Sequence, residues 1–209
     1  IIFFVFCIYC ILLSLLVAKD IMLSFESSLF YFRVGVFSCF IWYLVDRDKT
    51  ILAYFYYALI LCFLVLVIDG YIQYFTGTNL SGFKKSGIRV SSFFGDELIM
   101  GSYLSRLMPL LFALFVIKKK KEFEIYFIGL LFILVDVLIF MSGERSTFFF
   151  LNLSTVFIII LIKDYQKLRL ITFIIAIGCV FILSLNSSKL NKRMFTGPAE
   201  DMGLIESPK

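Results

Sequence analysis

The tetrapeptide Gly143-Glu144-Arg145-Ser146 places a carboxylate and a guanidinium between two long apolar runs of the chain. A charged residue near the middle of a membrane-spanning helix costs roughly 2.5 to 3.5 kcal/mol, so a charge kept at a helix end usually meets a partner or a charged ligand. A guanidinium stays protonated and can grip phosphate oxygens with two parallel hydrogen bonds. We therefore expect this tetrapeptide to belong to a site that binds an anion.

Three further charged residues lie inside apolar runs, namely Arg33, Arg106 and Asp136. At a rise of about 1.5 Å per helical residue, all three lie roughly 9 to 12 Å below the same membrane surface. One interpretation pairs Arg106 with Asp136 as an ion pair between neighbouring helices, and another lets Arg106 face the anion. Arg33 has no obvious carboxylate at its depth, so it either extends outward to the interface or faces the same cavity.

The composition sets the class of protein that must position these residues. Hydrophobic residues make up 61% of the chain, and the mean hydropathy is +1.00. Several apolar runs approach the roughly 20 residues that a helix needs to cross a membrane, and none alternates with the period of two typical of a barrel strand. We predict an all-α, polytopic transmembrane helical bundle. Its expected spans are 1–18, 27–45, 50–68, 98–117, 123–141, 146–162 and 168–185.

Short basic connections orient these spans. They contain Arg47 and Lys49, then Lys118 to Lys121, then Lys163, Lys167 and Arg169. Their spacing puts them on one side, which the positive-inside rule makes the cytoplasm. The polar segments expected on the other side are 69–97, the turn from Ser142 to Arg145, and the tail 186–209. The four-lysine run is interpreted as a topology anchor, and we expect no nucleic-acid partner.

Several kinds of chemistry have no support in the sequence. The chain contains no His, which removes the usual general base, and each of its five Cys falls inside an apolar segment. Cys7 and Cys10 form an isolated C-x-x-C without a second pair of ligands. We therefore expect no metal site, no cofactor and no disulfide.

Two motifs on the outer side carry a family resemblance. The first is Arg89-x-Ser-x-Phe-Phe-Gly-Asp-Glu-x-x-x-Gly-Ser-Tyr-Leu, preceded by the stretch from Asp69 to Gly82, and the second is the segment from Ser142 to Ser146. In order and spacing these motifs resemble the O-antigen ligase and O-antigen polymerase family of bacterial inner-membrane glycosyltransferases. The similarity extends over roughly residues 27–185.

The resemblance implies a glycosyltransferase C-like bundle that takes a glycan from undecaprenyl pyrophosphate on the periplasmic face of the inner membrane. The acceptor is lipid A core for a ligase or a growing polysaccharide for a polymerase, and the sequence leaves both open. The resemblance implies that Arg89 and Arg145 neutralise the pyrophosphate leaving group. Further candidates for substrate binding are Arg33, Arg106, Asp69, Gln73, Asp96, Glu97 and Glu144.

Some features depart from the family or fit another function. Many relatives have Pro-Asn where this chain has Asp96-Glu97, and these carboxylates also suit the start of a helix, whose dipole they would complement. The family uses a His in a large periplasmic loop, so we expect the chain to be a fragment, with a helical domain over 1–185 and the beginning of that loop over 186–209. The alternative is a transporter or flippase of lipid-linked glycan, in which the same arginines line a passage. An inverted repeat would favour that alternative, and none is visible in the sequence.

Overall fold

The computed structural model of the chain describes residues 2–118 and 122–201. Within these residues the regular structure is helical and contains no strand, which confirms the predicted all-α class. The long helices are α1 (Ile2–Val17), α2 (Ile21–Arg47), α3 (Thr50–Thr76), α4 (Met100–Ile117), α5 (Glu122–Met141), α6 (Arg145–Leu161) and α7 (Gln166–Asn186). The short ones are η1 (Ser92–Phe94), α8 (Ser188–Asn191), η2 (Lys192–Thr196) and α9 (Gly197–Asp201).

Five of the described helices are long and apolar enough to cross a membrane, namely α2, α3, α4, α5 and α7. Two others, α1 and α6, are apolar but shorter. A helix of about 20 apolar residues spans the hydrocarbon core. The helices therefore indicate a membrane protein, and the count of seven spans stays a prediction.

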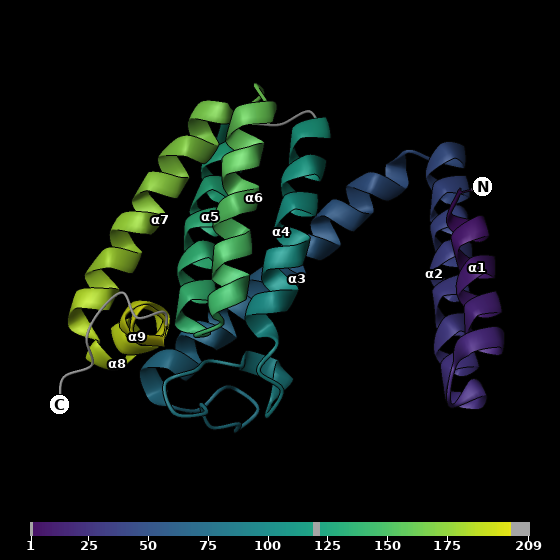
Figure 1. The fold of residues 1–209 in the computed structure, drawn as a ribbon. Coiled ribbons are helices and arrows are strands. Elements are labelled where there is room, and N and C mark those ends of the chain that lie inside the picture. Colours follow the sequence, from purple (N-terminus) through teal and green to yellow (C-terminus); the bar gives the residue numbers. More distant parts are fainter. Residues whose placement is uncertain (1, 119–121, 202–209) are drawn as a thin grey trace. The chain divides into compact units, whose positions relative to one another are not determined.

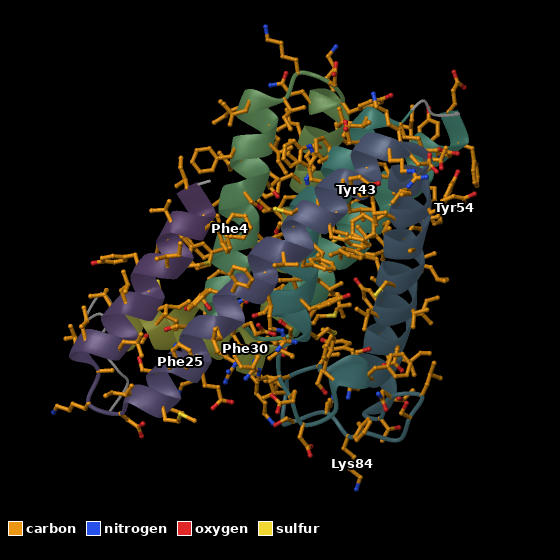
Figure 2. All side chains as sticks on the ribbon, turned by 90° about the vertical axis from the view of Figure 1, so that its right-hand side faces the viewer. Phe4, Phe25, Phe30, Tyr43, Tyr54 and Lys84 are labelled. Atoms are coloured by element: carbon orange, nitrogen blue, oxygen red, sulfur yellow. The ribbon has the colours of Figure 1, made fainter. Side chains whose placement is uncertain are left out.

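The chain forms two compact units whose boundary falls within α3, after Phe55. In the first unit α1 packs along α2 through aromatic side chains, with the rings of Phe4 and Phe32 5.8 Å apart edge to face. Gly35 permits this approach, because a Cβ there would collide with the ring of Phe3. Arg33 is exposed on α2, and its guanidinium lies 4.9 Å from the centre of the ring of Phe30. Figure 2 labels Phe30 on this helix.

The second unit, from Tyr56 onward, is a bundle in which α4, α5, α6 and α7 run side by side (Figure 1). Its centre is aromatic, since the ring of Phe132 on α5 lies 5.9 Å from Phe112 and 6.3 Å from Phe115 on α4. The α5 helix is the most enclosed of the candidate spans, as its nearly continuous apolar sequence predicts. This bundle supports the loops described below.

A buried ion pair holds α5, α6 and α7 together, and it differs from the predicted one. The carboxylate of Asp136 accepts two hydrogen bonds from Arg169, at 3.0 and 3.3 Å, and Arg169 donates a third to the hydroxyl of Thr155 at 2.7 Å. The prediction of an Arg106–Asp136 pair is wrong. Arg169 was also expected in a cytoplasmic connection, yet it lies in the first turn of α7 and is 1% exposed. The long side chain of Arg169 reaches the Asp136 carboxylate inside the bundle. The hydrogen bonds to this carboxylate replace the water that would have solvated the guanidinium in a loop.

The irregular segments gather at one end of this unit, which we call the loop end (Figure 1). It comprises the loop 77–99, the turn Ser142–Glu144 and the short helices after Ser187. The predicted outer loop 69–97 begins later than expected, because α3 continues to Thr76. The tail predicted as the start of a loop is helical over most of 188–201.

Basic residues lie at the opposite end of the bundle. Lys118 follows α4 and forms an ion pair with Glu124 at 3.2 Å, and it also donates a hydrogen bond to the hydroxyl of Tyr57. The rest of the predicted four-lysine run, Lys119 to Lys121, lies outside the described residues. The end of α4, which Lys118 follows, and the connection from α6 to α7 lie at the same end of the bundle (Figure 1).

Candidate functional site at the loop end

Asp69, near the end of α3, fixes the loop that follows. Its side chain is fully buried and accepts hydrogen bonds from the backbone amide of Leu80 at 2.8 Å and from the hydroxyl of Ser92 at 2.6 Å. The amide of Asn79 donates to it at 3.3 Å. A buried carboxylate is tolerated only when such donors replace water. Asp69 therefore ties both halves of the loop 77–99 to the end of α3.

Gln73, one helical turn further along α3, also ties the loop 77–99 to this helix, through both the oxygen and the nitrogen of its side-chain amide. Its carbonyl oxygen accepts from the backbone amides of Ser91 and Ser92, each at 2.8 Å, and its NH2 group donates to the carbonyl of Phe83 at 3.2 Å. These bonds hold Ser92 at a φ of +52°, which is unusual for a residue with a side chain. Together Asp69 and Gln73 set the course of the loop that carries Arg89.

Glu144 completes the start of α4. The residue before that helix, Ile99, has no side-chain acceptor, and Glu144 supplies one from the turn before α6. Its carboxylate accepts from the backbone amides of Gly101 at 2.9 Å and Ser102 at 3.0 Å, and from the hydroxyls of Ser102 and Thr147 at 2.6 and 2.9 Å. A carboxylate at a helix N-terminus is favoured by the free amides and the helix dipole. Glu144 thus links α4 to α6.

Three arginines converge on the turn between α5 and α6, and we call Arg89, Arg145 and Arg193 the arginine cluster. The Nε atom of Arg89 donates to the carbonyl of Ser142 at 3.0 Å, and the Nε of Arg193 donates to the carbonyl of Gly143 at 3.0 Å. The Nε of Arg145 donates to the carbonyl of Arg193 itself at 2.6 Å. Side chains from three separate segments are therefore anchored to each other through backbone carbonyls.

Gly143 makes this close approach possible. Its φ of +68° lies in the left-handed region, which glycine adopts without a steric penalty. A Cβ built at this position would lie 3.0 Å from Nε of Arg193 and 3.1 Å from Cγ of Arg89. Both the backbone conformation and the packing of two arginines thus require glycine here.

Two members of the cluster border a cavity of about 570 Å³, which we call the basic pocket. It is lined by Ser86, Gly87, Ile88, Arg89, Leu98, Lys189 and Arg193. The pocket wall contains three cationic side chains and no carboxylate. Burial, followed by the charge of Arg193, lowers the pKa of Arg89 from its ordinary value, while Glu144 acts in the opposite direction. Like charges held this close favour a bound anion, which would relieve their repulsion.

The structure brings together only some of the predicted site residues. Arg89 is bonded to the turn at Ser142, and Arg145 is linked to the same turn through Arg193. The side chains of Asp96 and Glu97 are exposed and make no hydrogen bond to another described residue.

The other predicted residues lie elsewhere or hold structure. Asp69, Gln73 and Glu144 have their hydrogen-bonding groups occupied by loop and helix backbone. Arg106 lines a different cavity, between α4 and α6, and Arg33 belongs to the first unit.

Two residues of the basic pocket were missed by sequence reasoning. Lys189 and Arg193 fall in the predicted tail 186–209, although their spacing of four residues places them on one face of a helix. Their position after the last apolar run, on the same predicted side as Arg89 and Arg145, was the available signal.

Comparisons of the chain with protein-family models, with curated proteins and with solved structures find no match.

Proposed function

We propose that the chain is a membrane glycosyltransferase that resembles the O-antigen ligases and polymerases. It would transfer a glycan from undecaprenyl pyrophosphate to lipid A core or to a growing polysaccharide. The observation that carries this proposal is the convergence of Arg89, Arg145 and Arg193 on the turn at Gly143. A diphosphate carries several negative charges and matches a pocket walled by cations.

The proposed chemistry uses these cations at the leaving group. When the bond between the anomeric carbon and the phosphate oxygen breaks, the diphosphate leaves with the electron pair while an acceptor hydroxyl forms the new glycosidic bond. Fixed guanidiniums aimed at the developing charge lower the barrier without a metal. The acceptor's proton goes to a base, for which the family resemblance implies a His, and this chain contains none.

The proposal also fixes an arrangement in the membrane. The loop end would face the periplasm, where lipid-linked glycans are polymerised and ligated, and the end with Lys118 would face the cytoplasm. With α1 and α6 counted as short spans, the chain would cross seven times in a glycosyltransferase C-like fold. The gathering of polar loops at one end of the bundle supports this arrangement (Figure 1).

The experiment replaces Arg89 or Arg145 by alanine in the full-length protein in its own bacterium. We expect surface polysaccharide to be lost while the amount of the protein in the membrane is unchanged. Lys84→Ala is the matched control. Lys84 is an exposed cation of the loop 77–99, which also carries Arg89, and its side chain points outward from that loop (Figure 2). Normal polysaccharide in both arginine variants would contradict the proposal.

The same cells separate a transferase from a flippase. A defective transferase leaves its lipid-linked donor on the periplasmic leaflet, where a glycosidase introduced into the periplasm can cut the glycan. A defective flippase leaves the donor on the cytoplasmic leaflet, protected from that enzyme. We expect the glycosidase-sensitive donor to accumulate in the Arg89→Ala strain, and accumulation of protected donor would favour the transporter.

A further inference from the structure

A second cavity lies between α4 and α6, and we call it the α4–α6 groove. Its volume is about 550 Å³. It is lined by Ser102, Ser105, Arg106, Pro109, Ser146, Thr147, Phe150, Leu153, Ser154 and Phe157. A smaller cavity of about 330 Å³ shares Ser102 and Arg106 with it. None of these residues lines the basic pocket, so the groove is a separate site.

Arg106 is the only cation in the lining of this groove, and its charge is not compensated by the described residues. It makes no hydrogen bond or ion pair to any of them. The nearby carboxylate of Glu144 is occupied by amides and hydroxyls of α4 and α6, and the carboxylate of Asp136 is bound by Arg169. A guanidinium on a membrane-spanning helix is costly unless it meets an anion or water. Among the described residues Arg106 thus has no counter-ion, and an anion supplied by the membrane would compensate its charge.

The groove changes from polar to apolar along its length. Arg106 lies about 9 Å along α4 from its start at the loop end. Helical side chains tilt toward the N-terminus, so its guanidinium reaches back toward the loop end. The hydroxyl of Ser146, at the start of α6, lies at that end and has no hydrogen-bond partner among the described residues. Phe150 and Phe157 follow it, one and three turns deeper on α6, and both are exposed.

We propose that the α4–α6 groove binds an anionic phospholipid of the surrounding membrane. The lipid phosphate would accept hydrogen bonds from Arg106 and Ser146, and an acyl chain would lie along Phe150 and Phe157. A hydrocarbon chain alone would leave Arg106 uncompensated, and a soluble anion would make no contact with the exposed aromatic wall. The combination of one cation and an apolar channel matches a phospholipid. This inference does not rest on the proposed transferase activity.

Fluorescence quenching by brominated lipids tests the proposal on the full chain in vesicles. The only tryptophan, Trp42, belongs to the first unit, so Trp42→Phe combined with Phe157→Trp places a single reporter in the groove. The probes are phosphatidylglycerol and phosphatidylcholine with identical brominated chains, each diluted into unlabelled phosphatidylcholine. We expect the anionic lipid to be preferred roughly fivefold at the reporter, as one basic residue near anionic lipid favours it by about 1 kcal/mol.

Charge variants of Arg106 decide the outcome. Arg106→Gln is expected to abolish the preference and Arg106→Lys to keep it. Arg33→Gln, which removes an exposed arginine of the first unit, is expected to leave it unchanged. Equal quenching by both lipids in the reporter protein, or an unchanged preference in Arg106→Gln, would overturn the proposal. Because no glycan donor is present, either result is independent of the proposed function.

Discussion

The substitution Gly143→Ala tests whether the turn between α5 and α6 is what holds the arginine cluster together. An alanine at the φ of +68° pays a left-handed penalty of about 1 to 2 kcal/mol. Its Cβ, 3.0 Å from Nε of Arg193, also forces that side chain to move by a few tenths of an ångström. Loss of the 3.0 Å bond from Arg193 to the Gly143 carbonyl adds about 1 kcal/mol for a partly exposed guanidinium. The expected destabilisation is about 2 to 3 kcal/mol.

Gly82→Ala is the matched control for this substitution. Gly82 has a φ of +87° and no atom within 4 Å of its missing Cβ, so alanine there incurs a comparable left-handed strain without touching an arginine. The assay is the free energy of unfolding of the full chain in mixed detergent and SDS micelles, together with the surface polysaccharide of the same strains. We expect Gly143→Ala to lose about 1 kcal/mol more than Gly82→Ala, and to lose polysaccharide where the control retains it. Equal effects of the two substitutions would refute the packing argument.

Three other predictions concern residues that the structure assigns to support. Asp69→Asn should make the loop 77–99 more sensitive to limited proteolysis, because its new NH2 group would face the donors at Leu80 and Ser92. Asp96→Asn, at an exposed site, should leave the cleavage rate unchanged. Arg169→Leu should destabilise the bundle by about 3 to 5 kcal/mol in the same unfolding assay, because it leaves the Asp136 carboxylate buried without its partner. Adding Asp136→Leu should restore most of that stability. A double variant as unstable as the single one would contradict the pairing. Glu144→Gln should cost about 1 to 2 kcal/mol and increase hydrogen exchange in the first turn of α4, and unchanged exchange there would argue against its capping role.

The sequence was sufficient for the all-helical class, and Arg89 and Arg145, which were expected on one side of the membrane, both lie at the loop end. Length and apolar composition are the signals for a membrane-spanning helix, so most of the long runs were placed within a few residues. The exceptions are α2, which begins six residues before the predicted span, and α3, which ends eight residues after it. The two arginines were grouped because the family resemblance assigns both to the diphosphate. Their contact through Arg193 could not be predicted, since a polar tail has no apolar periodicity from which to place a helix.

The partners of buried polar groups were the least predictable feature. Depth placed Asp136 beside Arg106, but a carboxylate on α5 is within reach of cations on several neighbouring helices, and Arg169 occupies it. Asp69 and Gln73 were proposed as substrate-binding residues, yet their partners lie on a loop whose course is set by those same bonds. Sequence spacing contains no information about such a mutual dependence.

Titration of the purified full chain with a short-chain polyprenyl diphosphate tests the central claim most directly, because it measures anion binding by the arginine cluster without the glycan or the acceptor. We predict saturable binding that weakens about tenfold or more in Arg89→Ala and in Arg193→Ala, as expected for the loss of one charge-assisted hydrogen-bond donor, and that is unchanged in Lys84→Ala. Equal affinity in all four proteins, or no binding by any of them, would contradict the assignment of this pocket to a diphosphate.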